Sequence, residues 1–130
     1  MDVVTLHCPL TDETSAMFGD RELGEMKPSA YVVNCARGGI VDERALANAL
    51  TSRAIAGAGL DVFAREPLPG DDPLIGIDNL ITSPHVAGVT LEASIRMASG
   101  AAANVLAAFD GRLDPAVVVN SEVLNSTAVS

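Results

Sequence analysis

The sequence predicts an α/β fold, in which helices flank a parallel β-sheet. Short runs of β-branched and small apolar residues alternate along the chain with stretches of helical periodicity. This alternation is typical of strand–helix–strand units. Glycine, proline or a polar residue follows each run, as is common where a strand ends. The predicted sheet is parallel with right-handed crossovers. Because its strands all run the same way, they should present their carboxyl ends at one edge of the sheet.

The first stretch of the chain is expected to hold one strand and two short helices. Residues 3–8 are β-branched and apolar, and Pro9 ends the run. Residues 11–18 are expected to pass from a loop into a short helix. Asp20 can then cap a second short helix, which has to finish before Pro28.

The next strand and its helix form the stretch around which the rest is organised. Residues 31–36 are an apolar run without clean alternation, which is typical of a strand covered on both faces. Arg37 ends the run, two glycines turn the backbone, and Asp42 is a good N-cap for a helix over residues 43–50. Arg37 is therefore expected where open α/β sheets bind ligands, although a surface arginine in a loop fits this stretch equally well.

The second half of the chain adds two strands and a long helix. Residues 54–62 are small and apolar, which favours a strand in close contact with a helix. A proline-rich loop leads to a short strand over residues 79–83. Residues 90–109 predict a threonine-capped helix with one apolar face, in which Gly100 suggests a close packing contact. Residues 117–120 could form a last strand.

Composition and charge narrow the class of function. The 130 residues, 48% of them hydrophobic, suit one domain with a real core. A net charge of −9 argues against nucleic acid or an anionic membrane surface as partner, but leaves room for a small anionic ligand beside an arginine. No apolar run approaches the length of a membrane span. Cys8 and Cys35 fit no metal or redox spacing, so we expect free thiols in a reducing cytoplasm.

Polar side chains gather where the predicted strands end. Arg37 offers a planar fork that matches a carboxylate. His85, which follows the fourth strand, can give and take a proton near neutral pH. Glu66, in the loop after the third strand, could accept a hydrogen bond from the other ring nitrogen and fix the tautomer. This set suits proton transfer to the oxygen of a 2-keto acid, with a nicotinamide as the source of hydride.

Each of these residues also has a plainer interpretation. A histidine after Ser-Pro, such as His85, is more often a loop residue than a catalyst. Glu66 could be solvated, and Asp61 could be a turn residue that hydrogen-bonds its own backbone. His7 lies inside a predicted strand and is expected in the core or at the rim of the sheet. Only the shared position at one sheet edge favours the catalytic interpretation.

Together, several segments resemble the D-isomer-specific 2-hydroxyacid dehydrogenases. They occur in family order, and the similarity runs from residue 2 to about residue 111. The segments are DVVTLHCPLT (2–11), VNCARGGIVD (33–42), GLDVF (59–63) with Glu66-Pro67, and SPHVAG (83–88). The tail, Val118-Val119-Asn120 with Leu124, more weakly resembles the phosphoglycerate dehydrogenase branch.

The resemblance implies roles for the residues at the sheet edge. Arg37 would bind the substrate carboxylate, His85 would be the acid and base, and Glu66 would be its partner. The related formate dehydrogenases place a glutamine at the position of Glu66, so carbonyl reduction is favoured here. NAD, or alternatively NADP, would be the cofactor, and no metal is implied. The contacts to the cofactor would come from Cys8, Cys35, Ala36, Arg37, Asp61 (near the nicotinamide carboxamide), His85, Val86, Ala87 and Gly88.

One part of the family pattern is not found in this sequence. The family's G-x-G-x-x-G turn holds the pyrophosphate with its amides and a helix N-terminus, and Gly57-x-Gly59 lacks that spacing. The expected fold is therefore an incomplete Rossmann-like parallel sheet, the second half of a dinucleotide-binding domain with flanking helices. Residues 1–111 would be the partial NAD-binding and catalytic domain, and residues 112–130 a remnant of the substrate domain.

These expectations combine into an enzyme fragment with two open alternatives. The chain would belong to a cytoplasmic NAD-dependent oxidoreductase that interconverts a small anionic 2-hydroxy acid and a 2-keto acid, in the manner of 3-phosphoglycerate dehydrogenase. The full-length enzyme is expected to be a homodimer. The first alternative is a non-catalytic dimerisation module that uses the apolar face of the helix over residues 90–109. The second is a ligand sensor, similar to corepressors that retain the arginine, glutamate and histidine.

Overall fold

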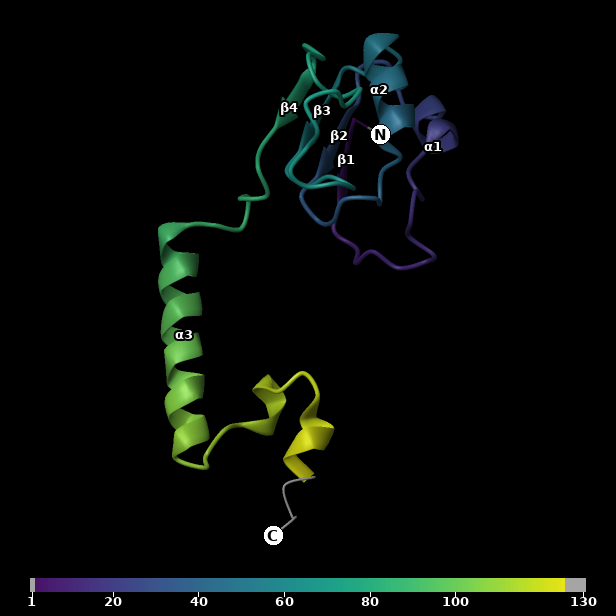
Figure 1. Cartoon of the computed structure of the whole chain (residues 1–130). Coiled ribbons are helices and arrows are strands. Elements are labelled where there is room, and N and C mark those ends of the chain that lie inside the picture. Colours follow the sequence, from purple (N-terminus) through teal and green to yellow (C-terminus); the bar gives the residue numbers. More distant parts are fainter. Residues whose placement is uncertain (1, 126–130) are drawn as a thin grey trace. The chain divides into compact units, whose positions relative to one another are not determined.

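A computed structural model describes residues 2–125, and the chain divides into two compact units, Met1–Ala87 and Gly88–Ser130. The first unit holds four strands and two helices, and the second holds one long helix and two 3₁₀ turns (Figure 1). In chain order the elements are β1 (Val3–Leu6), α1 (Asp20–Gly24), β2 (Tyr31–Asn34), α2 (Glu43–Thr51), β3 (Gly57–Leu60), β4 (Leu80–Thr82), α3 (Leu91–Phe109), Pro115–Val117 and Ser121–Asn125. The division at residue 111 expected from the sequence stays a prediction.

The four strands form one parallel sheet in the order β1-β2-β3-β4. Leu6 is paired with Asn34, Asn34 with Leu60, and Leu60 with Thr82, so the strands end almost level. The predicted α/β fold with a parallel sheet is confirmed. The carboxyl ends of all four strands lie along a single edge, as parallel pairing requires.

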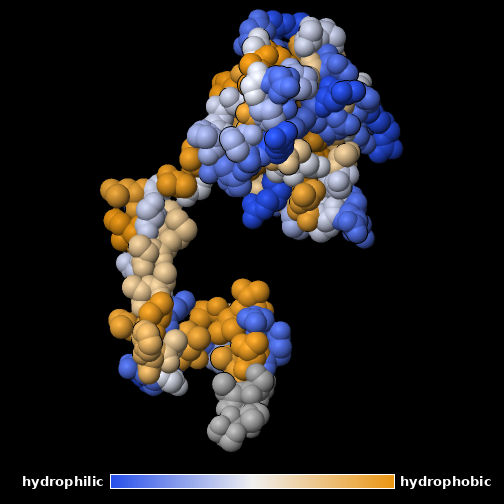
Figure 2. Space-filling view, in the orientation of Figure 1, coloured by the Kyte–Doolittle hydropathy of each residue, from blue (hydrophilic) through white to orange (hydrophobic). Residues whose placement is uncertain are grey.

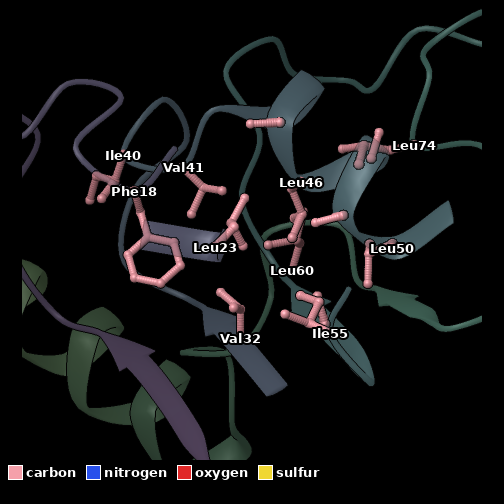
Figure 3. Close-up of a cluster of buried hydrophobic side chains, with 14 of the residues drawn as sticks. Phe18, Leu23, Val32, Ile40, Val41, Leu46, Leu50, Ile55, Leu60 and Leu74 are labelled. Atoms are coloured by element: carbon pink, nitrogen blue, oxygen red, sulfur yellow. The ribbon is translucent and has the colours of Figure 1, made fainter. Parts of the chain in front are cut away.

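Helix α2 is stabilised by an N-terminal cap and by the burial of its apolar face. The carboxylate of Asp42 accepts hydrogen bonds from the N–H groups of Arg44 (3.0 Å) and Ala45 (3.1 Å), as the sequence predicted. Leu46 and Leu50 lie one turn apart and are fully buried. They join a cluster of side chains from the sheet and the loops (Figure 3). Each fully buried leucine contributes about 1.5–3 kcal/mol, which fixes α2 on the sheet.

The opposite face of the sheet is open in the described part of the first unit. The apolar run at residues 31–36 predicted a strand covered on both faces, and that prediction is wrong for this unit. Val32 is fully buried, whereas Tyr31 is 51% and Ile81 78% exposed. The reason is that α1 and α2 lie over one face only (Figure 1). β1 pairs only with β2, which leaves its other edge unpaired among the described residues.

Two short helical predictions near the start of the chain need correction. Residues 12–16 form turns and Phe18 makes an isolated β-bridge with Val41, so no helix forms there. The hydroxyl of Thr14 donates to the carbonyl of Pro9 (2.7 Å) and accepts from the N–H of Thr11 (2.7 Å), and these local bonds compete with a helix. Gly19 is the N-cap of α1, so Asp20 is its first residue and not its cap.

The second unit is built on α3, whose predicted bounds are confirmed. The Thr90 hydroxyl oxygen caps it by accepting from the N–H of Ala93 (3.1 Å). No side chain of α3 is buried, and Figure 2 shows apolar residues along it. Among the described residues of this unit, an added Cβ at Gly100 would meet no atom within 4 Å, so the expected packing contact stays a prediction. Within residues 2–125, no helix combines the length and hydropathy that crossing a membrane requires.

The predicted strand at residues 117–120 is also wrong. Pro115–Val117 forms a 3₁₀ turn instead, because the carboxylate of Asp114 accepts from the N–H of Ala116 (2.9 Å) and a proline follows the cap. A proline at this position favours a helical turn over a strand. Residues 119 and 120 are in a turn that leads to the second 3₁₀ segment.

Candidate active site

The candidate site lies along the edge of the sheet where the four strands end. β1 is followed by His7 and Cys8, β2 by residues 35–37, β3 by Asp61, and β4 by residues 83–85. Since the strands are parallel and adjacent, residues distant in sequence share this rim. The structure therefore places at one edge the side chains that the sequence singled out.

His85 and Glu66 make the central contact of the rim. Nδ1 of His85 lies 2.8 Å from Oε2 of Glu66, and the N–H of Phe63 donates to Oε1 (2.9 Å). A carboxylate only accepts, so Nδ1 carries the hydrogen and Nε2 is left for another partner. The hydrogen bond from His85, followed by that from Phe63, lowers the pKa of Glu66. The histidine side chain is 52% exposed, so it is open to a ligand.

Asp61 is the buried carboxylate of the rim, with 2% of its surface exposed. It accepts hydrogen bonds from the hydroxyl of Ser83 (2.6 Å) and from the N–H groups of Val86 and Ala87 (both 2.9 Å). The bond from Ser83 is the main cause that lowers the pKa of Asp61, and burial opposes it. The Asp61 side chain therefore binds the turn after β4, whereas the plainer interpretation expected a bond to its own backbone.

Arg37 lies on a loop whose backbone is hydrogen-bonded by the buried side chain of Asn34. Asn34 is 1% exposed, and its side chain donates to the carbonyl of Arg37 (2.9 Å) and accepts from the N–H of Ala36 (3.1 Å). The guanidinium is exposed and donates to the carbonyl of Ala36 (2.6 Å). Across residues 2–125, no carboxylate lies within ion-pair distance of it. The cation is thus available for an external anion.

A backbone contact fixes the Arg37 loop against the Glu66 loop. A Cβ added at Gly38 would lie 1.9 Å from the carbonyl oxygen of Phe63, whose N–H binds Glu66. Glu43, at the start of α2, accepts from the next N–H, that of Ala64 (2.6 Å). Burial raises the pKa of Glu43. These contacts join the two loops through backbone groups, so their relative position is well determined.

A cavity of about 410 Å³ opens beside the Arg37 loop. His7 is exposed at this rim, with Nε2 2.8 Å from the hydroxyl oxygen of Thr5. Four of the residues that line the cavity are expected to contact the cofactor, namely Cys8, Cys35, Ala36 and Arg37. The other two, His7 and Pro9, follow β1.

The structure assembles the expected site in two parts. Glu66 and His85 are in direct contact, whereas Arg37 shares their rim without a hydrogen bond or ion pair to either in the described chain. Val86 and Ala87, expected to bind cofactor through their backbone, donate their N–H groups to Asp61. Gly88, also expected there, begins the second unit.

Sequence reasoning missed three residues that shape the site, namely Asn34, Glu43 and Ser83. Asn34 did carry a signal, because a polar residue in a buried apolar strand has to find hydrogen-bond partners. Glu43 and Ser83 bind groups 21 and 22 residues away, so no local pattern marks them.

Comparison with known proteins decides the family. The model of the D-isomer specific 2-hydroxyacid dehydrogenase NAD-binding domain matches residues 1–87. The chain belongs to this family.

Members of the dehydrogenase family are similar over nearly the whole chain. A glyoxylate reductase from Thermofilum pendens is 49% identical over 123 residues, which are 95% of this chain and 36% of the relative. A glyoxylate/hydroxypyruvate reductase B from Escherichia fergusonii is 46% identical over 87% of this chain and 35% of its own length. The chain thus spans just over a third of these dehydrogenases.

A solved structure of the family has the same fold. The NAD-complexed D-isomer specific 2-hydroxyacid dehydrogenase from Lactobacillus delbrueckii ssp. bulgaricus has a TM-score of 0.79 and 36% identity, over 90% of this chain and 40% of that chain. The family is thus shown by a domain model, by relatives and by a structure. The resemblance predicted from the sequence is confirmed.

The rim fits one part of the dinucleotide that this family binds. The cavity is lined by the Arg37 guanidinium, which has no ion-pair partner within residues 2–125. The strand ends lie where open α/β sheets hold cofactors. The 130 residues contain no glycine-rich turn of the G-x-G-x-x-G type for the pyrophosphate. The described residues therefore provide part of such a crevice without that glycine-rich turn.

Proposed function

We propose that this chain carries the substrate-binding and acid/base part of an NAD-dependent oxidoreductase that interconverts a 2-hydroxy acid and a 2-keto acid. The observation that supports it most is the hydrogen bond between Glu66 and His85 on the rim that also holds Arg37. That geometry leaves Nε2 of the imidazole and the guanidinium free to meet one small anion.

The proposed chemistry assigns one task to each side chain. Arg37 binds the substrate carboxylate through paired N–H donors. In reduction, His85 gives the proton on Nε2 to the carbonyl oxygen, and in oxidation it takes that proton back. Glu66 holds the Nδ1 hydrogen and stabilises the imidazolium. The bound nicotinamide supplies or accepts the hydride.

The substrate class is small and anionic in this proposal. The two relatives reported above are named for glyoxylate and for glyoxylate and hydroxypyruvate. We therefore propose a compact 2-keto acid of that kind first. The narrower expectation of a 3-phosphoglycerate substrate rests on the weak resemblance of the tail and remains a prediction.

A chimera tests the proposed reaction. This chain would replace the matched 123 residues of the Thermofilum pendens relative, which then supplies the rest of the enzyme. We expect the chimera to oxidise NADH in the presence of glyoxylate or hydroxypyruvate, as followed by NADH absorbance. A folded chimera that binds NADH but turns over none of a panel of 2-keto acids would contradict the proposed reaction.

Two substitutions in the chimera test the proposed roles. His85→Ala should lower kcat by about 10²–10⁴-fold, with a smaller change in KM. Arg37→Ala should chiefly raise the KM for the keto acid, by about 10–100-fold, because a charge-assisted bond to the carboxylate is lost. Arg53→Ala is the control, since Arg53 pairs with Asp78 before β4, at the other edge of the sheet. Equal and mild effects of the first two would mean that the roles are misassigned.

A second candidate function is association through α3. The observation that favours it is that no side chain of α3 is buried, while Leu106 is 65% and Phe109 86% exposed. Contiguous exposed apolar surface commonly marks an interaction site. Size-exclusion chromatography with light scattering would support it by showing a dimer that Leu106→Glu dissociates. A monomer at all concentrations would count against it.

A further inference from the structure

We propose that Asp61 and Ser83 form a positioning pair for His85, which holds the turn of residues 83–87 so that the imidazole meets Glu66. This inference rests on the proposed function, since it concerns the group assigned there as acid and base. It goes beyond that function by giving Asp61 a task within the protein itself.

Several hydrogen bonds connect the turn to the end of β3. The N–H of Ser83 donates to the carbonyl of Leu60 (2.9 Å), and the N–H of His85 donates to the carbonyl of Asp61 (2.8 Å). The Asp61 carboxylate accepts hydrogen bonds from the next two N–H groups, those of Val86 and Ala87, and from the Ser83 hydroxyl. Two successive amides and one hydroxyl thus converge on a single buried carboxylate.

The backbone of His85 explains why such ties are needed. Its φ of +56° lies in the left-handed region, which residues with a Cβ adopt uncommonly because it costs free energy. Bonds before and after His85 impose this conformation. The imidazole then leaves the turn toward Glu66, with Nδ1 2.8 Å from the carboxylate. Without the ties the turn could relax to a less strained backbone and carry the imidazole away.

The hydrogen bonds of Asp61 favour a role in holding the turn over a role in binding a ligand directly. One of its carboxylate oxygens accepts two hydrogen bonds and the other accepts one, and only 2% of the residue is exposed. A carboxylate oxygen has about two acceptor sites. At most one site is therefore left, on a group that has almost no accessible surface.

Amide hydrogen exchange in the 130-residue chain tests the pair without any need for turnover. Asp61→Asn presents an amide donor to one of the two N–H groups and should speed exchange at Val86 or Ala87 about tenfold or more. Ser83→Ala should speed exchange at the same amides by a smaller factor, and Ser83→Thr, which keeps the hydroxyl, should restore it. Asp78→Asn is the matched control, on an exposed carboxylate that pairs with Arg53.

Glu66→Gln separates this inference from its rival. If Asp61 holds the turn, exchange at Val86 and Ala87 stays unchanged when the Glu66 charge is removed. Equal acceleration in Glu66→Gln, or unchanged rates in both Asp61→Asn and Ser83→Ala, would overturn the inference. Should Asp61→Asn fail to fold, the comparison of Ser83→Ala with Ser83→Thr still decides it.

Kinetics of the chimera supply the second readout. Ser83→Ala should lower kcat about 3–30-fold while the KM for the keto acid and the Kd for NADH stay within about twofold, and Ser83→Thr should recover kcat. A raised Kd for NADH with full turnover at saturation would instead make the pair a cofactor contact, and the inference would be wrong. If the chimera shows no reductase activity at all, the proposed function fails, and the exchange rates still decide the positioning role.

Discussion

At the scale of the residue, the site depends on carboxylates that are held by several donors. Glu66 accepts from an imidazole and a backbone N–H, and Asp61 accepts from a hydroxyl and two N–H groups. Each carboxylate is stabilised in its charged form, so the pKa of each is lower than usual. A neighbouring acid, Glu43, is desolvated and has a raised pKa. The local environment of each acid therefore decides its protonation.

The lowered pKa of Glu66 predicts how stability depends on pH. As the pH falls below about 4.5, the unfolded chain takes up a proton at Glu66 before the folded chain does. The stabilisation is thus present above that value and is lost as the pH falls through the folded pKa. We expect the free energy of unfolding of Glu66→Gln to fall less steeply between about pH 5 and pH 3 than that of the unsubstituted chain. Urea unfolding across this range measures it.

The control for this pH dependence is Glu13→Gln, at an exposed glutamate outside the rim. It should leave the acid slope of the free energy unchanged. Equal slopes for Glu66→Gln and the unsubstituted chain would show that the bond to His85 does not stabilise the Glu66 carboxylate.

Gly38 supports a steric prediction at the same scale. A methyl group there would collide with the carbonyl of Phe63, so the loops of Arg37 and Glu66 would have to separate. Gly38→Ala should lower the free energy of unfolding by about 1–3 kcal/mol. Gly70→Ala is the control, because an added Cβ at Gly70 would have no atom within 4 Å. Thermal and urea unfolding of both variants provide the measurement, and equal stabilities would contradict the contact.

The sequence predicted the residues of the rim better than their partners. Arg37, Asp61 and His85 lie at or just beyond the carboxyl ends of predicted strands. Because parallel strands end at one edge, topology alone placed them together. The partner of Asp61 could not be predicted in the same way. The hydroxyl of Ser83 and the N–H groups beyond it come from a different loop, and only the folded chain shows that they converge.

At the scale of the element, helices form where the sequence has both an N-cap residue and apolar residues at helical spacing. α2 and α3 have both signals, and their predicted bounds are confirmed. The predictions for residues 14–18 and 117–120 lacked both, and local hydrogen bonds of Thr14 and Asp114 decided these segments. Short segments follow such local bonds because they have too few apolar contacts to override them.

The Asp42 cap of α2 is predicted to contribute to the stability of the fold that supports the site. Asp42→Ala removes the acceptor of two N–H groups and should cost about 1 kcal/mol of stability. Asp42→Asn keeps an acceptor oxygen and should cost less, since asparagine is as good a cap. Urea unfolding of the two variants compares them. An alanine variant as stable as the asparagine variant would show that the cap does not stabilise α2.

At the scale of the whole molecule, the described chain is a partly covered dinucleotide-binding sheet. Four strands end at a rim that holds the hydrogen bond between Glu66 and His85 together with Arg37. Within residues 2–87, one face of the sheet is exposed and β1 pairs only with β2. The parallel sheet was predicted from the alternation of strands and helices, and its strand order is a finding of the structure. The exposed face of the sheet could not be predicted, because the sequence pattern of an apolar strand does not depend on whether a helix covers it.

The central claim is that this chain holds the reacting end of a cofactor site whose pyrophosphate grip it does not contain. Titration with NADH, followed by the fluorescence of the nicotinamide, tests it most directly. We predict that the 130-residue chain does not saturate at micromolar NADH, and that the chimera with the glycine-rich part of the relative does. Micromolar affinity for the chain alone, unaffected by Arg37→Ala, would contradict the claim.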